Sequence, residues 1–312
     1  MREVGAVDMN YKKIISSRTL RFKIMQALSF LPDSMIIKLQ YKIKTGHTLH
    51  LKNPVRYTEK LQWYKLNYKN PVLKDCVDKY NVRKYVEDHT LKNILNECYG
   101  VFNSPEEIDF GGLPDKFVCK DTLGGGSTSV IVVDKNNVNL AELKNTMQRW
   151  VDEPTDKKHP GREWPYDNQK HRIIIEKFLE QDNGDLADFK FFCFNGRVKC
   201  FYVRTDYAKS HDSGKMAFFN REKELLNGVG MDYCNAATEV PELVPEIDQM
   251  IIYAENLSKD FPHVRVDFYD VNGRVIFGEL TFYNASGYMK FIPDDFDKEL
   301  GKEFILPRKD EK

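Results

Sequence analysis

The sequence predicts an α+β fold in which helices come first and antiparallel strands follow. The first hundred residues carry apolar side chains at helical spacing, and from Phe102 onward short β-rich runs are separated by turn residues. Asn-Gly pairs at 195–196 and 272–273 each lie in the middle of a long hairpin pattern. With 312 residues, 41% hydrophobic and 30% charged, the chain is typical of a globular protein of roughly two domains.

The composition excludes several classes of protein. No apolar run reaches the roughly 20 residues that a transmembrane helix needs. No basic segment, apolar core and small-residue cleavage site open the chain, so we expect no export. The six cysteines are scattered without a CxxC pair, which favours reduced cytosolic thiols over a disulfide scaffold or a zinc module.

The charges balance overall, at 47 Lys and Arg against 47 Asp and Glu, but they are unevenly distributed. Residues 1–60 carry twelve basic and four acidic residues, a surplus of eight, interleaved with apolar positions in Thr19–Leu31 and Met35–Ile43. This pattern favours either a solvated basic helical face packed on the body of the protein, or contact with an anionic membrane surface or an acidic polymer.

The individual elements follow from spacing and turn residues. Asn53-Pro54 predicts a turn before a helix that begins near Thr58 and is ended by Asn70-Pro71. Further helices are predicted over Val72–Glu87, Leu140–Val151 and Val244–Lys259. Strands are predicted over Lys116–Lys120, Val130–Val133 and Arg172–Leu179, and hairpins over Asp188–Asp206 and Val264–Phe282, with a loop-rich section between the hairpins.

A glycine-rich loop, Gly124–Ser129, lies between two predicted strands directly after Lys120. Backbone N–H groups of such a loop can bind phosphate oxygens, and the flanking strands let it act as a lid. It is neither a Walker loop, because no Gly-Lys-Ser/Thr follows, nor a dinucleotide fingerprint, because a strand follows it. A flexible linker beside a surface lysine is the alternative.

The last hairpin carries two carboxylates whose relative position depends on the turn. A two-residue Asn-Gly loop pairs Asp267 with Gly278 and sends Glu279 to the opposite face, whereas a three-residue loop over 271–273 with a left-handed glycine bulge brings both acids to one face. We predict the three-residue loop. Two such acids suit Mg²⁺ and phosphates; a strand face on which Arg265 neutralises one acid is an equal alternative.

The buried strand end, Ile175–Leu179, is a third candidate, since free backbone groups there can pair with adenine; a plain connection between domains is the alternative. No Gly-x-Ser-x-Gly motif occurs and the seven histidines are dispersed, which argues against a nucleophilic triad. Basic and aromatic residues form no RNA-binding signature, so we expect no nucleic-acid partner.

Taken in order, these motifs resemble the ATP-grasp fold, and in particular the TupA-like ATP-grasp proteins of teichuronopeptide and capsular polysaccharide synthesis. The similarity covers roughly residues 53–300. It rests on Asn53-Pro54 with Glu59–Trp63, on Leu113–Val118, on Asp188–Gly196 and on Leu257–Phe282. It implies two α+β subdomains that grip a nucleotide, with a helical amino-terminal region. The segments expected are 1–60 (basic, helical), 61–112 (amino-terminal subdomain), 113–179 (lid subdomain) and 180–312 (carboxy-terminal subdomain with the metal site).

The resemblance also implies the roles of single residues. The implied nucleotide-binding residues are Lys79, Lys120, Gly124, Gly125, Gly126, Ser127, Glu176, Lys177, Leu179, Asp188 and Lys190. Among them Lys79 and Lys120 contact the phosphates, while Glu176, Lys177 and Leu179 frame adenine. The implied metal ligands are Asp267, Glu279, Thr281 and Asn284, and the implied catalytic residues are Lys120, Arg265 and Arg204.

One position departs from the pattern that the resemblance implies. The wider fold usually has Asn two residues after the metal Glu, and here Thr281 occupies that position. A hydroxyl is a poorer Mg²⁺ ligand than an amide carbonyl, so either Asn284 supplies the missing oxygen or a second ion binds more weakly. Arg265 is expected to stabilise charge on the reacting acyl centre, and Arg204 to reach toward phosphate or substrate.

The implied activity is ATP-dependent ligation of a carboxylate to an amine through an acylphosphate, with ATP and Mg²⁺ as cofactors. The expected partners are a carboxylate-bearing sugar or polymer precursor of the capsule or cell wall and an amine donor. We expect a cytoplasmic protein, with peripheral membrane contact through the basic amino-terminal segment as a further expectation. The alternatives are a phosphotransferase, a non-catalytic protein of this fold, and a polysaccharide glycosyltransferase that uses a nucleotide sugar, for which Asp295-Phe296-Asp297 supplies an Asp-x-Asp pattern.

Overall fold

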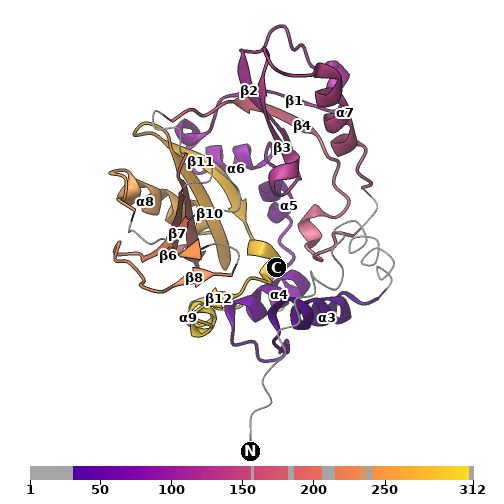
Figure 1. The fold of residues 1–312 in the computed structure, drawn as a ribbon. Coiled ribbons are helices and arrows are strands. Elements are labelled where there is room, and N and C mark those ends of the chain that lie inside the picture. Colours follow the sequence, from indigo (N-terminus) through magenta and orange to yellow (C-terminus); the bar gives the residue numbers. More distant parts are fainter. Residues whose placement is uncertain are drawn as a thin grey trace, which may run out of the picture.

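The computed structural model describes residues 31–155, 158–181, 186–205, 215–232, 235–236 and 241–308. Helices are combined with antiparallel sheets, which confirms the predicted α+β class. A four-stranded sheet lies at one end of the molecule and a six-stranded sheet at its side, with α5 and α6 between them (Figure 1). The predicted basic stretch Thr19–Leu31, apart from Leu31, lies outside the described residues.

The helical region contains one break that the sequence analysis did not predict. Its helices are α3 (Asp33–Thr45), α4 (Tyr57–Asn67), α5 (Val72–Val77) and α6 (Val82–Asp88). The single helix predicted over Val72–Glu87 is therefore wrong. Asp78 Oδ1 accepts the backbone N–H groups of Tyr80 at 2.8 Å and Asn81 at 2.9 Å, and this side-chain turn separates the two helices.

The smaller sheet has the strand order β1-β4-β2-β3, with every pair antiparallel. Its strands are β1 (Cys98–Phe102), β2 (Lys116–Asp121), β3 (Val130–Asp134) and β4 (Ile173–Lys177). Helix α7 (Leu140–Val151) packs on this sheet through Leu143, Met147 and Trp150. β1 lies ahead of residue 113, where the lid segment was expected to begin, and that segment division stays a prediction.

The larger sheet has the order β11-β10-β5-β6-β7-β9. Its strands are β5 (Asp188–Phe194), β6 (Arg197–Thr205), β7 (Lys215–Asn220), β9 (Asn235–Ala236), β10 (His263–Asp270) and β11 (Val275–Thr281). The section between the hairpins thus supplies β7, β9 and a short β8 (Gly230–Met231), which pairs with β12 (Phe291–Ile292). Helix α9 (Asp295–Glu303) follows and packs on α4.

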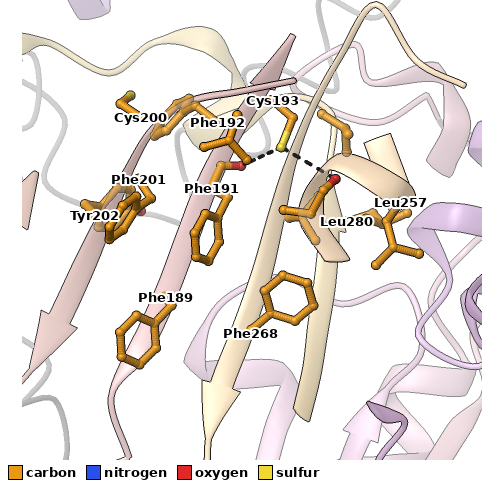
Figure 2. Packing of buried hydrophobic residues seen from close by; sticks show 14 of the residues in the cluster. Phe189, Phe191, Phe192, Cys193, Cys200, Phe201, Tyr202, Leu257, Phe268 and Leu280 are labelled. Atoms are coloured by element: carbon orange, nitrogen blue, oxygen red, sulfur yellow. Dashed lines mark hydrogen bonds between the residues drawn. The ribbon is translucent and has the colours of Figure 1, made fainter. Parts of the chain in front are cut away.

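One face of the larger sheet is a hydrophobic core covered by α8 (Ile247–Ser258). Phe189, Phe191 and Phe268 are fully buried there, and Cys193 Sγ lies among them, directed toward the carbonyls of Phe191 and Ala254 (Figure 2). Because side chains alternate along a strand, Asp188 and Lys190 point to the other face. No helix in the described part of the chain is long and apolar enough to cross a membrane.

The turn of the last hairpin differs from the prediction, but Asp267 and Glu279 still lie on one face, as predicted. Val271 and Arg274 exchange both backbone hydrogen bonds, at 2.9 and 3.1 Å, so the loop has only two residues, both left-handed. The three-residue loop is therefore wrong. A bulge at Gly278 inside β11 supplies the extra residue instead, and it pairs Asp267 with Glu279. The prediction that the two acids share a face is confirmed.

Candidate active site

The charged residues of the candidate site form rows across the larger sheet. Strand register places Glu279 of β11, Asp267 of β10 and Lys190 of β5 side by side, on the face away from α8. In the next row Asp188 of β5 lies opposite Arg204 of β6. The adjacent strands therefore bring together residues that are up to about ninety positions apart in the sequence.

Arg265 is the centre of an ion-pair cluster. Its Nε donates to Asp267 Oδ1 at 2.7 Å, and its Nη2 donates to Asp267 Oδ2 at 2.6 Å and to Glu279 Oε1 at 2.9 Å. Lys190 Nζ binds the same Asp267 carboxylate and also Asp188 Oδ2, at 2.6 Å. Asp267 is 1% exposed, whereas half of the Glu279 side chain is exposed. The two predicted acids are therefore joined by one guanidinium.

The two carboxylates differ in their electrostatic environment. Burial raises the pKa of Asp267, against the attraction of Arg265 and Lys190. Burial acts in the same direction on Glu279, but Arg265, Lys190 and Lys79 outweigh it and lower the pKa of Glu279 to about 2. Glu279 is therefore ionised at neutral pH. Its exposed half is in contact with solvent.

The other two predicted metal ligands also touch Arg265. Thr281 Oγ1 accepts from Nη2 at 3.0 Å and donates to Glu279 Oε1 at 2.9 Å, and Asn284 Oδ1 accepts from Nη1. All four predicted ligands thus surround one guanidinium. In this arrangement Arg265 neutralises the acids, as in the alternative that treats this face as a salt-bridged strand surface.

Lys79 is hydrogen-bonded to the glycine loop and the strand end before it. It lies in the turn between α5 and α6, so its predicted position inside a helix is wrong. Its backbone N–H donates to Thr122 O at 2.9 Å, and its Nζ donates to the carbonyls of Asp121, at 3.1 Å, and Gly124. Burial lowers the pKa of Lys79, and the negative charge of Glu279 opposes that shift. Lys79 is therefore fixed to the glycine loop, and its charge interacts favourably with Glu279.

The glycine loop has one packed glycine and two exposed ones. A Cβ at Gly124 would collide with Ser129 and lie 2.7 Å from Asp121 Oδ2, so a side chain does not fit there. Gly125 and Gly126 are exposed, and Gly126 has a φ of +77°, which favours glycine. The side chain of Ser127 lies outside the described residues. The exposed part of the loop is the part available for a ligand.

Lys120 contacts the strand end Ile175–Leu179, which was predicted to pair with adenine. Lys120 Nζ lies 2.6 Å from Glu176 Oε2, and Arg83 approaches the same carboxylate at 3.5 Å. The backbone N–H of Lys177 donates to Glu97 O and its carbonyl accepts from Asn96 Nδ2, both at 2.9 Å. The expectation of free backbone groups is therefore wrong at Lys177, although a carbonyl keeps a second lone pair. Leu179 lies beyond the end of β4 and is half-buried.

The loop after β11 is held in an unusual conformation that the sequence analysis missed. Ala285, Ser286 and Gly287 have φ values of 43°, 56° and 67°, and two consecutive left-handed non-glycine residues are costly. The buried Lys65 Nζ donates to Ser286 O at 2.6 Å and to Gly161 O at 2.9 Å, and burial lowers its pKa to about 7. No spacing signal links Lys65 to a loop more than two hundred residues away.

Asp121, at the start of the glycine loop, was also missed. Its carboxylate oxygens lie 2.9 and 2.8 Å from His171 Nδ1, and Oδ1 accepts the backbone N–H of Leu123 at 3.1 Å. These contacts fix the entry to the loop. An Asp at a strand end gives a weak sequence signal, and its histidine partner is 50 positions away.

The predicted metal ligands include only two carboxylates, Asp267 and Glu279. In the part of the chain that the structure describes, no group of three or more His, Cys, Asp or Glu could hold a metal ion. Two surface cavities, of about 910 and 720 Å³, lie beside α6 and beside the first hairpin, and none of the predicted site residues lines either of them. Asp188 Oδ1 is buried and has no hydrogen-bond partner among the described residues.

A match to a known protein family agrees with the motifs. The sequence profile of the TupA-like ATPgrasp family matches residues 59–305. No curated protein matches the chain. Among solved structures, the D-alanine–D-alanine ligase of Bacillus anthracis is similar at 17% identity, with a TM-score of 0.40, over 73% of this chain and 64% of that one.

Two further structures are similar at the same level. The ATP-grasp ligase PsnB with a minimal precursor has 12% identity and a TM-score of 0.43, over 79% of this chain and 66% of that one. The ADP complex of PurK, an N5-carboxyaminoimidazole ribonucleotide synthetase, has 15% identity and a TM-score of 0.40, over 80% and 57%. The chain spans less than two-thirds of the length of each of the three.

Proposed function

Because the chain belongs to the TupA-like ATP-grasp family, we propose that it is an ATP-dependent ligase that joins a carboxylate to an amine. The proposal rests above all on the juxtaposition of Asp267 and Glu279, paired across β10 and β11. Lys79, held by the glycine loop, adds positive charge that helps to lower the pKa of Glu279. Lysines, carboxylates and a glycine loop are suited to phosphoryl transfer, in which positioning and charge neutralisation supply most of the catalysis.

The nucleotide binds, in this proposal, between the glycine loop and the larger sheet. Lys79 and Lys120 contact its phosphates, and Gly125 and Gly126 supply backbone N–H groups over them. In the structure Lys79 binds the carbonyl of Gly124 and Lys120 binds Glu176, so both ammonium groups have partners that a phosphate would replace. Leu179, beyond the strand end, is the remaining backbone group for adenine.

The donor set fits Mg²⁺. Mg²⁺ prefers oxygen ligands and is commonly held by one or two carboxylates together with substrate phosphates, so a cluster of three acids is not required. Asp267 and Glu279 would hold the ion, with Asn284 and the weaker donor Thr281 beside them. When bound, the ion neutralises phosphate charge. Two solved structures are consistent with this assignment. One is a complex of PsnB with Mg and ADP, and the other is a complex of the B. anthracis ligase with ATP.

The chain's own residues orient the reactants and balance their charge. The substrate carboxylate attacks the γ-phosphate of ATP to give an acylphosphate and ADP, and the amine then displaces phosphate to give the amide. Arg265, freed from part of its contact with the acids, stabilises charge on the acyl centre, while Arg204, opposite Asp188, faces phosphate or substrate. Neither step needs a protein nucleophile.

The proposed acid is a uronic acid or an acidic precursor of a capsule or cell-wall polysaccharide, and the proposed amine is an amino acid. ATP-dependent phosphate release, screened over uronic acids paired with amino acids, tests this assignment. Release that requires both partners, with a product mass equal to that of the amide, supports it. A phosphorylated acceptor without amide, or thermal stabilisation by sugar nucleotides alone, contradicts it and favours the phosphotransferase or the glycosyltransferase respectively.

A further inference from the structure

Helix α3 carries apolar side chains on two faces. The inner face is buried, and Ile37 and Tyr41 pack against Leu49 and Tyr288. The outer face exposes Met35, Leu39 and Ile43, which are 55%, 49% and 46% exposed. Because they are four residues apart, these three side chains form one stripe along the helix, here called the outer stripe.

The exposed charged residues beside the outer stripe are both positive and lie along one side of it. Lys38 and Lys42 are exposed beside it, and Lys42 Nζ donates to Gly46 O at 2.8 Å. The only acidic residue in the helix is Asp33 at its first turn, which lies 3.0 Å from Lys158 Nζ. Residues 1–30, directly ahead in the chain, carry six Lys and Arg against two Asp and Glu. The helix and the segment that precedes it in the sequence therefore both carry an excess of positive charge.

The size of the outer stripe argues against a protein partner. A stable interface between proteins takes about 20–30 residues on each side. The helix has 13 residues, which is about 20 Å in length, and the stripe has three apolar side chains. A narrow apolar line with exposed lysines along one side instead matches the geometry of helices that lie in the plane of a bilayer.

We propose that the outer face of α3 docks on an anionic lipid bilayer. The outer stripe enters the boundary between headgroups and acyl chains, and Lys38 and Lys42 lie at the level of the anionic headgroups. α3 lies at the opposite end of the molecule from the glycine-loop sheet (Figure 1). Docking would therefore leave the candidate site accessible, and the proposal does not depend on the proposed ligase activity.

Cosedimentation of the full chain with vesicles tests the proposal. We expect binding to vesicles of 3:1 phosphatidylcholine and phosphatidylglycerol, and little binding to phosphatidylcholine alone. The double variant Leu39→Ser/Ile43→Ser should lose most of the bound fraction. Lys38→Gln/Lys42→Gln should weaken binding about fivefold for each lysine removed.

The matched controls are Ile252→Ser, a 63% exposed residue on α8, and Lys302→Gln, an exposed lysine on α9; both should bind as the unchanged protein does. The lysine pair keeps the test decisive if the serine pair does not fold. The proposal is overturned if the full chain does not bind, if neutral vesicles bind it equally well, or if the α3 variants bind normally. It is equally overturned if light scattering shows a dimer that the serine pair dissociates, because a second copy then covers the stripe.

Discussion

At the scale of single residues, Arg265 determines the state of the candidate site. Its guanidinium contacts Asp267, Glu279 and two polar neighbours. A buried arginine with so many acceptors fixes the geometry of the acids, and removing one partner of such a cluster leaves a charge uncompensated. Glu279 is an exception among the partners of Arg265. Half of its side chain reaches solvent, so its replacement leaves no fully buried charge without compensation.

Glu279→Gln should therefore abolish activity without unfolding the protein. The amide retains the shape but removes the negative charge, and the loss of one electrostatic contact of this kind costs about 100-fold or more in rate. ATP-dependent phosphate release and thermal melting are the two measurements. Glu299→Gln, at an exposed position on α9, is the control. A Glu279→Gln enzyme of near-normal rate would show that this residue is not a metal ligand.

Lys120→Ala should likewise abolish turnover, because it removes a positive charge from the proposed phosphate site. Lys116→Ala, at the exposed start of the same strand, should leave the rate unchanged. Circular dichroism of both variants checks that β2 is intact. Equal rates for the two variants would remove Lys120 from the proposed machinery and leave it as a structural partner of Glu176.

The proximity of Asp267 and Glu279 could be predicted because both lie in one hairpin, whose strands pair them; their role as metal ligands stays a prediction. The contacts that position the loops around these acids could not be predicted from the sequence. Lys65 reaches its loop across more than two hundred residues of sequence, and Asp121 meets His171 across 50. Contacts between residues so far apart depend on tertiary packing, and a short stretch of sequence carries no information about it.

At the scale of elements, local signals decided which predictions succeeded. α7 has the predicted bounds, and Asn139 caps it by accepting the N–H groups of Ala141 and Glu142. β1 was missed because β4, its partner among the described strands, lies about seventy residues later, and because its own residues are all partly exposed. The bulge at Gly278 was missed because it depends on the close approach of Asp267 O across the hairpin.

The Asp-x-Asp pattern at the start of α9 is explained by packing. Asp297 is 4% exposed, and its two oxygens accept the backbone N–H and the Oγ1 hydroxyl of Thr58, at 2.9 and 2.7 Å. Asp297 thereby joins α9 to the start of α4. This carboxylate is committed within the protein and is not exposed to a nucleotide sugar.

Asp297→Asn should therefore destabilise the protein by roughly 1–3 kcal/mol while retaining turnover, since it disturbs a buried acceptor far from the proposed chemistry. Urea denaturation and phosphate release measure the two effects. Asp295→Asn, whose side chain is 76% exposed, should change neither. Loss of activity in both variants with unchanged stability would instead support the glycosyltransferase.

At the scale of the whole molecule, His263 joins the helical region to the larger sheet. Its ring is fully buried, with Nε2 lying 2.8 Å from Tyr57 Oη and Nδ1 lying 2.9 Å from Cys193 O. A neutral ring that donates from Nδ1 and accepts at Nε2 satisfies both contacts. Burial, reinforced by the positive charge of Arg265, lowers the pKa of His263 to about 3.

Acid should therefore destabilise the fold through His263. Below pH 6.5 the unfolded chain protonates this histidine and the folded protein does not, so its contribution is complete above pH 6.5 and declines as the pH falls toward 3. The contribution of His263 to the free energy of unfolding falls by up to about 1.4 kcal/mol per pH unit. Urea denaturation at several pH values between 7.5 and 5 measures the free energy of unfolding. As the pH falls, this free energy should decrease less steeply for His263→Gln than for the unchanged protein. An identical slope in both proteins would rule out this histidine as the cause.

The order of strands in the larger sheet has a consequence for synthesis. β10 pairs with β5 in the interior of this sheet, and the Lys190–Asp267 contact spans 77 positions. As the chain leaves the ribosome, β5, β6 and β7 emerge first, and β5 then presents a bare hydrophobic edge. Such edges recruit other chains. A nascent chain that stalls before His263 therefore exposes a surface prone to aggregation, and that edge is covered only when β10 has been translated.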